Sequence, residues 1–385
     1  MPKNSKKLSI GFLFDDTLDS NDGVAQYVKT LGAWLSGRGH EVSYLVGESH
    51  TKEWAGGKVY SLAKNVKVIF NGNRLSMPLP ATSTDIKKLM ANQHFDVLHV
   101  QAPYSPFMSQ KVINASSHST TVVGTFHVFP SGWLARTGAH LLRVFYGSSL
   151  LRIQPMLAVS PAAAGFAKEA FNLKCLISPN VVAIARFKIK NAHSSTDQST
   201  IVFLGRLVKR KGCRQLLEAF KLLSQKMPEV RLTIAGDGPE RPELEQFVIR
   251  HGLEQSVDFL GFIDEKDKPL LLAGADIACF PSLGGESFGI VLIEAMAAGA
   301  GVILGGDNEG YRGVLGAQPK LLVDANNSAV FAARLEELLT DKELASTLHS
   351  WQAQEAKRYD VATVGPQVLG IYKEAIANRS SKGHN

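Results

Sequence analysis

The sequence predicts an α/β protein built from two doubly wound domains. Apolar runs bounded by turn residues alternate with segments of helical period, and this alternation occurs in both halves of the chain. Unbroken apolar strands separated by helices are typical of parallel sheets covered by helices on both faces. A chain of 385 residues is also too long for one ordinary core. We therefore expect two Rossmann-like domains, each with its own parallel sheet.

The first half contains five apolar runs that we expect to form buried strands. They span residues 8–14, 41–46, 97–100, 121–126 and 156–159. A helix is expected after the first strand, at residues 24–37. The first run is too short for the apolar region of a signal peptide and ends directly at Asp15, so we interpret it as a strand.

The second half repeats this pattern. Its expected strands span residues 201–204, 231–235, 257–260, 277–280, 302–304 and 321–323, and its expected helices span residues 213–226, 242–251 and 290–298. Residues 235–239 resemble the start of a dinucleotide fingerprint, but Arg241 stands where the third glycine is required. This departure argues against a nicotinamide-dependent enzyme.

The boundary between the domains is expected near Ser178, Pro179 and Asn180, where turn residues precede a polar stretch. The first domain then covers residues 1–180 and the second covers residues 181–359. A last helix, over about residues 360–380, lies beyond the final strand, and residues 380–385 are expected to fray.

Cysteine usage and hydropathy limit the cellular setting. Cys175, Cys213 and Cys279 are far apart and lack the spacing of a zinc or redox site, so we expect reduced thiols in a cytoplasmic protein. Glu294 interrupts the most apolar stretch, and no window offers the roughly 18 uncharged apolar residues of a membrane span. Any membrane contact is therefore expected to be peripheral.

The net charge of +7 is concentrated in the first half. Residues 1–180 hold 18 Lys and Arg against 10 Asp and Glu, and no acidic residue occurs between Asp96 and Glu169. A basic surface attracts anions such as lipid headgroups, although a merely solvated surface is the alternative. Within this interval, apolar residues from Trp133 to Leu151 mingle with Arg136, Arg143 and Arg152. They fit either an interfacial helix or an ordinary core.

Ligands of open α/β sheets bind outside the carboxyl ends of the strands. A site shared by two such domains is therefore expected in the cleft between them. In the first domain, Gly23 opens a helix whose free backbone N–H groups would suit a diphosphate. His127 directly follows the strand at residues 121–126, although a lone histidine is more often structural.

The second domain offers cations at the same kind of position. Gly205 and Arg206 end a strand, and Lys211 directly precedes a helix, so a guanidinium and an ammonium can converge on one anion. Such an arrangement suits a departing nucleotide diphosphate. The alternative is a solvated basic loop, which would account for Lys209 and Arg210 but less easily for Arg206, so close to a buried strand.

The most informative segment is residues 284–296. Its glycines let the backbone approach a ligand, and main-chain N–H groups at the helix start can bind one. The residues at this start are Ser287, Phe288, Gly289 and Ile290. Glu286 in the loop and Glu294 in the helix can accept hydrogen bonds from sugar hydroxyls. Glu294 otherwise interrupts an apolar helix, which is costly unless the carboxylate is paired or liganded.

At this segment the sequence resembles family 4 of the retaining glycosyltransferases, and within it the phosphatidylinositol mannosyltransferases of actinobacteria. The family's signature of two glutamates separated by seven residues is present as Glu286 and Glu294. Gly205-Arg206 with Lys211-Gly212 matches its phosphate-binding loop, Thr125-Phe126-His127 its sugar-site histidine, and Gly23 its glycine-rich loop. The likeness extends from the first strand to the last helix. It implies a GT-B fold whose terminal helix crosses back to the first domain.

The resemblance also implies a role for each matching residue. Arg206 and Lys211 would stabilise the leaving diphosphate, Glu286 would hold sugar hydroxyls, and Glu294 would hold the ribose. His127 would contact the transferred hexose. The backbone around Ile263 would face the base. The donor would be a nucleotide-diphosphate sugar, with GDP-mannose favoured, and no obligatory metal or other cofactor is expected.

The implied function is transfer of a hexose to a membrane lipid such as phosphatidylinositol, by a peripheral protein on the inner face of the cell membrane that binds no nucleic acid. Two alternatives stay open: a UDP-hexose-dependent transferase with a soluble acceptor, and a non-catalytic subunit that binds nucleotide sugars.

The sequence departs from the family's pattern at two places. Asp22 replaces the first glycine of the usual pair, and Val181-Val182-Ala183 replaces the common Gly-Val-Asp. The first position lies in the donor loop and the second at the hinge.

Overall fold

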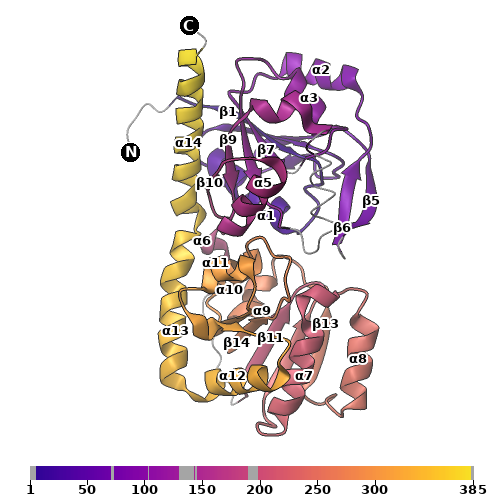
Figure 1. Cartoon of the computed structure of the whole chain (residues 1–385), viewed down its shortest axis with the longest axis vertical. Helices are drawn as coiled ribbons and strands as arrows, with labels where there is room; N and C mark the ends of the chain where they lie inside the picture. Colours follow the sequence, from indigo (N-terminus) through magenta and orange to yellow (C-terminus); the bar gives the residue numbers. More distant parts are fainter. Residues whose placement is uncertain are drawn as a thin grey trace. The chain divides into compact units, whose positions relative to one another are not determined.

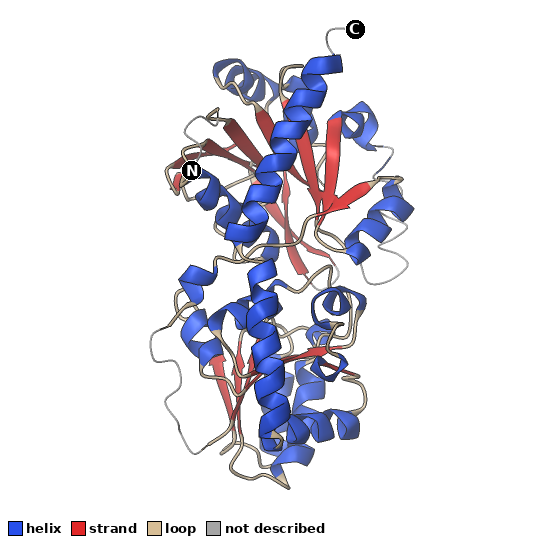
Figure 2. Cartoon of the chain, turned by 90° about the vertical axis from the view of Figure 1, so that its left-hand side faces the viewer, coloured by secondary structure: helices blue, strands red, loops and turns tan. Residues whose placement is uncertain are grey.

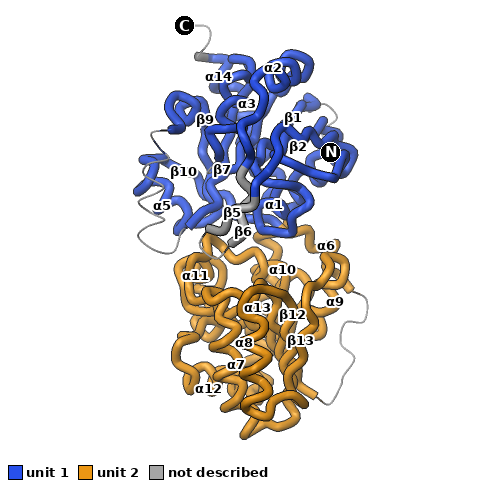
Figure 3. The backbone as a smooth tube through the Cα atoms, turned by 90° about the vertical axis from the view of Figure 1, so that its right-hand side faces the viewer, with its two compact units in different colours: residues 1–181, 361–385 blue, residues 182–360 orange. Residues whose placement is uncertain are grey.

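The computed structural model describes residues 6–70, 73–102, 104–129, 143, 145–189 and 198–382. The chain divides into two compact units (Figure 3). Unit 1 comprises Met1–Val181 and Val361–Asn385, and unit 2 comprises Val182–Asp360. The division falls one residue after the boundary expected from the sequence.

Unit 1 contains an eight-stranded sheet with the strand order β10-β9-β8-β7-β1-β2-β4-β3. Its neighbouring strands pair in parallel, except for the antiparallel β3–β4 pair. A separate antiparallel hairpin is formed by β5 and β6. The strands are β1 (Ser9–Phe14), β2 (Glu41–Val46), β3 (Glu53–Trp54), β4 (Gly57–Ser61), β5 (Asn65–Phe70), β6 (Asn73–Pro78), β7 (Val97–Ala102), β8 (Thr121–Phe126), β9 (Ile153–Ala158) and β10 (Cys175–Ile177).

Helices cover the central strands of this sheet, so that every residue of β7 and β8 is buried. The helices are α1 (Gly23–Ser36), α2 (Ser83–Asn92), α3 (Ser109–Ala115), the 3₁₀ helix η1 (Gly147–Arg152), α5 (Pro161–Phe171) and α14 (Val361–Lys382). The C-terminal helix α14 contacts β8, β9 and α1, and Figure 2 shows it lying along the sheet.

Unit 2 contains a six-stranded parallel sheet with the order β13-β12-β11-β14-β15-β16. Figure 1 labels β13, β11 and β14 of this sheet. Its strands are β11 (Thr200–Leu204), β12 (Arg231–Ala235), β13 (Val257–Gly261), β14 (Ile277–Phe280), β15 (Val302–Gly306) and β16 (Leu322–Val323). Its helices are α6 (Ile184–Phe187), η2 (Lys209–Lys211), α7 (Cys213–Ser224), α8 (Arg241–Arg250), α9 (Lys268–Ala273), α10 (Ile290–Ala298), α11 (Glu309–Leu315), η3 (Pro319–Leu321), α12 (Ser328–Thr340), α13 (Lys342–Glu355) and η4 (Ala356–Arg358).

The predicted fold class is confirmed, because each unit is a Rossmann-like parallel sheet with helices. The fraying expected from residue 380 is wrong for residues 380–382, which belong to α14. There the Ser380 and Ser381 hydroxyls donate to the carbonyls of Ile376 and Asn378, which continues the hydrogen bonding of the last turn. Residues 383–385 lie outside the described residues, as do residues 191–197 of the expected polar linker.

Candidate functional site

The strand order of unit 2 marks the place where a ligand is expected. From β11 the chain continues to β12 and β13 on one side of the sheet, and then crosses to β14 on the other side. The carboxyl ends of β11 and β14 therefore flank the point where the strand order reverses, which is the usual ligand site of an open α/β sheet. The loops after these two strands carry most of the residues predicted from the sequence.

The loop after β11 is held close to its neighbour. The backbone N–H of Gly205 donates to Ala235 O at 3.0 Å. Gly236 has a φ of +142°, and a Cβ at this position would collide with the carbonyl of Gly205. Only glycine fits there, so Gly205 and the half-buried Arg206 are placed by a tight backbone approach.

Glu286 lies in an ion cluster with two cations from η2. Its Oε1 is 2.6 Å from Arg210 Nη1 and 2.8 Å from Lys211 Nζ, and it accepts a hydrogen bond from the Ser282 hydroxyl at 2.9 Å. The backbones of the two loops are also joined, because Leu283 N–H donates to Arg210 O at 2.8 Å. The structure thus brings together the predicted Lys211 and Glu286. The Arg210 side chain is only 20% exposed, which argues against the alternative of a solvated loop at this residue.

Charge balance in this cluster favours an ionised Glu286. Burial by itself opposes ionisation, but Lys211 and Arg210 outweigh it and lower the pKa of Glu286 to about 2. Glu286 is therefore a carboxylate at neutral pH and can act only as a hydrogen-bond acceptor. An anionic ligand that binds Lys211 would compete with Glu286 for this cation.

A glycine determines the local structure at the start of α10. Its N-cap residue is Gly289, with a φ of +96°, and a Cβ there would collide with the ring of Tyr311. A glycine brings no side chain that could occupy the first N–H groups of the helix. Phe288 and Gly289 are buried, whereas Ser287 and Ile290 are half-buried at the same edge.

Glu294 lies in the second turn of α10 and is 5% exposed. Its Oε1 is 3.6 Å from Lys268 Nζ, and Lys268 also lies 2.5 Å from Glu265 Oε1. Burial raises the pKa of Glu294, and Lys268 offsets only part of this effect. The ion pair explains how a carboxylate is tolerated in an otherwise apolar helix.

Lys268 and Glu265 follow β13, as does the half-buried Ile263. The predicted base-facing segment and the predicted ribose carboxylate are thus linked through one short stretch of chain. Phe262 beside Ile263 is 67% exposed.

In unit 1, His127 follows β8 and is 7% exposed. Its Nε2 lies 2.8 Å from Gln101 Oε1 on β7, and the ring of Tyr27 from α1 stands edge-on to it with centroids 5.1 Å apart. Burial lowers the pKa of His127 to about 3, so the imidazole is neutral at physiological pH. A neutral imidazole of this kind can hydrogen-bond to a sugar hydroxyl without adding charge.

Comparisons with known proteins show the family to which the chain belongs. A model of glycosyl transferases group 1 matches residues 185–357, and a model of glycosyltransferase family 4 matches residues 21–185. The phosphatidyl-myo-inositol mannosyltransferase of Mycolicibacterium smegmatis is 33% identical over 377 residues, covering 95% of this chain and 94% of that protein. The protein of the same name from Mycobacterium leprae is 31% identical over 394 residues, covering 97% and 99%. The chain belongs to family 4 of the glycosyltransferases.

The solved structures show the same fold for this glycosyltransferase. A glycosyltransferase from Rickettsia africae superposes with a TM-score of 0.75 at 15% identity, covering 96% of this chain and 99% of that one. The predicted GT-B fold is therefore confirmed. Among the described residues of the glycosyltransferase, no helix is both long and apolar enough to cross a bilayer.

The structure corrects one detail of the predicted donor loop. Gly23 does begin α1, but the Asp22 carboxylate already accepts hydrogen bonds from Val24 N–H and Ala25 N–H, at 2.9 and 3.0 Å. The sequence analysis expected these N–H groups to be free for a diphosphate, but the Asp22 carboxylate already binds them. The reason is that Asp22, which replaces the family's usual glycine, is a strong N-cap residue.

The proposed interfacial helix is only partly described. Trp133, Leu134, Arg136, Leu141 and Leu142 lie outside the described residues. Phe145 and Leu151 are exposed by 65% and 75%, whereas Tyr146 is buried. Arg152 does not reach toward lipid, because its guanidinium donates to the carbonyls of Ile113, Ser116 and Ser117 at the end of α3. This contact corrects the expectation that Arg152 forms part of a basic lipid-facing surface.

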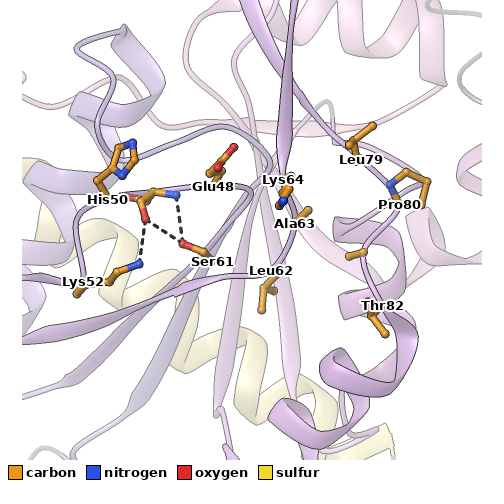
Figure 4. Close-up of a pocket in the computed structure, with 12 residues that line it drawn as sticks. Glu48, His50, Lys52, Ser61, Leu62, Ala63, Lys64, Leu79, Pro80 and Thr82 are labelled. Carbon is orange, nitrogen blue, oxygen red and sulfur yellow. Dashed lines mark hydrogen bonds between the residues drawn. The ribbon is translucent and has the colours of Figure 1, made fainter.

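A cavity of about 540 Å³ opens beside the carboxyl ends of β2 and β4 in unit 1 (Figure 4). Within it, the Ser61 hydroxyl and Lys52 Nζ both donate to Ser49 O, at 3.1 and 3.3 Å. The predicted site residues are absent from its lining, which consists of Glu48, Ser49, His50, Lys52, Ser61, Leu62, Ala63, Lys64, Leu79, Pro80, Ala81 and Thr82.

Sequence reasoning missed three partners of the predicted residues. Arg210 pairs with Glu286, Lys268 pairs with Glu294, and Gln101 binds His127. A buried carboxylate requires a cation nearby, so the existence of partners for the two glutamates could be inferred. Which residues these partners are could not be inferred from the sequence, because that depends on which loops lie side by side.

Proposed function

We propose that this glycosyltransferase moves mannose from GDP-mannose to a membrane phospholipid with an inositol headgroup, with retention of the anomeric configuration. The full-length similarity to enzymes named phosphatidyl-myo-inositol mannosyltransferases supports the donor sugar and the acceptor class. The family resemblance at Glu286 and Glu294 supports the retaining course of the reaction.

The observation that carries this proposal is the ion cluster of Arg210, Lys211 and Glu286 at the point where the strand order of unit 2 reverses. A nucleotide diphosphate entering there meets the cations of Arg210 and Lys211, and Arg206 lies in the same loop after β11. When the diphosphate binds Lys211, Glu286 loses part of its pairing and can accept a hydrogen bond from a hydroxyl of the attached sugar. A single site thus recognises both the leaving group and the sugar.

The reaction that fits these residues is a front-side displacement. The bond between the anomeric carbon and the diphosphate oxygen breaks, and the acceptor oxygen bonds to the same face of that carbon. The acceptor proton passes to the departing diphosphate oxygen, so no protein nucleophile is needed. Arg206 and Lys211 stabilise the negative charge of the leaving group, while Glu286 and His127 hold the hexose. Positioning and charge stabilisation supply most of the rate enhancement.

No metal is required in this scheme, because protein cations meet the leaving diphosphate. We further propose that the protein works in the cytoplasm, bound peripherally to the inner face of the cell membrane. The acid-free and basic interval between Asp96 and Glu169 supports attraction to anionic lipids. The exposed side chains of Phe145 and Leu151 in this interval add apolar surface.

The decisive experiment measures sugar transfer by the purified protein from GDP-mannose and from UDP-hexoses, with vesicles containing phosphatidylinositol or with soluble saccharides. We expect a mannolipid whose anomeric configuration by NMR matches that of the donor. The Glu286→Gln variant should lose activity by about 100-fold or more. Glu254→Gln, on an exposed loop of the same unit, is the matched control and should remain active.

Each alternative has its own outcome in this assay. Turnover only with a UDP-hexose and a soluble acceptor would replace the proposed donor and acceptor. A wild-type protein that binds nucleotide sugars but transfers none of them would identify a non-catalytic subunit. Membrane attachment is tested by co-sedimentation, where binding to anionic vesicles should fall as salt is raised. Equal sedimentation with neutral vesicles would contradict an electrostatic attachment.

A further inference from the structure

We infer that Gln101 is a positioning residue that holds His127 in one neutral tautomer, with the proton on Nε2 and the Nδ1 lone pair available to a hydroxyl of the transferred hexose. This inference rests on the proposed function, in which His127 contacts the sugar, and it adds the residue that sets the direction of that hydrogen bond.

The geometry begins with the register of two parallel strands. Gln101 on β7 pairs with Thr125 on β8, so His127 lies two residues beyond the partner of Gln101. Side chains two residues apart in a strand point to the same face of the sheet. His99 and Gln101 therefore share one face of β7, and Thr125 of β8 and His127, which directly follows β8, lie on the same face. The contact between Gln101 Oε1 and His127 Nε2, at 2.8 Å, is a direct consequence.

The orientation of the Gln101 amide is determined by the hydrogen bond that its nitrogen makes. Its Nε2 donates to the backbone carbonyl of His99 at 3.3 Å. A carbonyl oxygen can only accept a hydrogen bond, so the NH₂ group must face His99 and the amide oxygen must face His127. An amide oxygen is likewise only an acceptor. The imidazole must therefore donate from Nε2, which leaves Nδ1 without a proton in the neutral ring.

The position of the His99 carbonyl is itself well supported. The His99 ring is fully buried and bonded at both nitrogens, to Thr125 Oγ1 through Nε2 and to Tyr372 Oη through Nδ1, each at 2.6 Å. These contacts hold the residue that anchors Gln101. Thus β7, β8 and α14 together determine the tautomer of one imidazole.

The groups that face His127 keep it neutral. The Tyr27 ring from α1 contacts both His127 and His99, the His99 imidazole interacts electrostatically with His127, and Tyr372 of α14 contacts His99. Burial, together with the neighbouring His127, lowers the pKa of His99 to about 3. Burial raises the pKa of Tyr27 to about 12 and that of Tyr372 well above its ordinary value. These neighbours are all uncharged at neutral pH, so a carboxylate in place of the Gln101 amide would be a new charge beside the ring.

The tautomer matters for the chemistry of transfer. The anomeric carbon gains positive charge as the diphosphate departs, as in other glycosyl transfers. A neutral imidazole that accepts a hydrogen bond from a sugar hydroxyl is compatible with that charge. A protonated imidazole would instead be a donor at both nitrogens and would place a second positive charge near the reacting carbon, raising the barrier.

The test combines imidazole NMR with kinetics on the full-length protein. The ring ¹⁵N signals of His127 are assigned by their loss in His127→Asn and followed from pH 5 to 8. We expect wild-type His127 to carry its proton on Nε2 and to remain neutral throughout. In Gln101→Glu the new carboxylate should raise the pKa of His127, protonate the ring within this range, and lower kcat by about tenfold or more. The donor KM should change less than kcat.

Two further variants test whether the effects come from the Gln101 amide itself rather than from misfolding or from an added negative charge. Gln101→Met keeps the length of the side chain without the amide, so the tautomer preference should weaken while folding, checked by thermal unfolding, is retained. Gln154→Glu, at an exposed position of β9 in the same sheet, is the matched charge control and should leave both readouts unchanged.

The inference is overturned if wild-type His127 carries its proton on Nδ1, or if Gln101→Met keeps the wild-type tautomer and kcat. Neither result bears on the donor and acceptor assay. Conversely, turnover of a different substrate pair would refute the proposed function while the NMR result still decides the role of Gln101.

Discussion

The Tyr372 hydroxyl lies 2.6 Å from His99 Nδ1, although the two residues are 273 positions apart in the chain. Tyr372 belongs to the C-terminal helix α14 and His99 to the strand β7, and both side chains are fully buried. The last helix of the protein thus contributes a polar contact to the centre of unit 1. Because His99 anchors Gln101, this contact also supports the environment of His127.

Removing this hydroxyl should destabilise unit 1. In Tyr372→Phe one nitrogen of the buried His99 ring loses its partner, which costs about 1–3 kcal/mol. We expect the unfolding temperature to fall by several degrees in calorimetry. Tyr60→Phe, on β4 of the same sheet, should change it little. An unchanged unfolding temperature in Tyr372→Phe would mean that the hydrogen bond adds nothing to stability.

The ion cluster of Glu286 should make stability depend on pH. Its pKa is lowered from 4.5 to about 2 in the folded protein. A carboxyl whose folded pKa is depressed contributes stability that is fully present above the unfolded pKa and is lost as pH falls through the folded pKa. The ionisation of Glu286 in its folded environment should therefore contribute roughly 3 kcal/mol of stability above pH 4.5, which is lost toward pH 2.

This dependence is measured as the difference in unfolding free energy between wild-type protein and Glu286→Gln, by urea denaturation across that pH range. The difference should be constant near neutrality and shrink below pH 4.5. The same series with Glu254→Gln controls for the loss of a surface charge. A difference that does not change with pH would show that the cluster does not hold Glu286 ionised.

The buried pair of Glu294 and Lys268 should affect both stability and donor binding. Glu294→Ala leaves Lys268 with Glu265 as its remaining partner, so we expect a loss of about 1–3 kcal/mol, below the cost of a wholly unpaired buried charge. The KM for the nucleotide sugar should rise if Glu294 binds the ribose. Thermal unfolding and donor titration separate the two effects, and a destabilised variant with an unaltered KM would leave Glu294 as a structural residue alone.

Removal of divalent metal should leave transfer unchanged. The leaving diphosphate meets Arg206 and Lys211, which supply positive charge without a metal ion. The rate of sugar transfer should therefore be equal in excess EDTA and in Mg²⁺. Loss of activity in EDTA that Mg²⁺ or Mn²⁺ restores would contradict the proposed mechanism.

Several elements were predictable from the sequence to within a residue or two. The strands β2, β8, β12 and β14 and the helix α10 coincide with the expected ranges, because hydrophobic period and turn residues are local properties of the chain. Residues 53–78 were not predicted as strands. There β3 has only two residues, and β5 and β6 form a two-stranded hairpin that is separate from the main sheet.

The sequence by itself determined the fold class, the approximate boundary between the units, the family, and the positions of Glu286, Lys211 and His127 at the ends of strands. Only the tertiary structure decided which side chains meet them. Arg210 and Glu286 are 76 positions apart and are brought together because β11 and β14 are neighbours in the sheet. Such neighbours follow from strand order and register, which depend on the packing of whole elements and leave no local trace in the sequence.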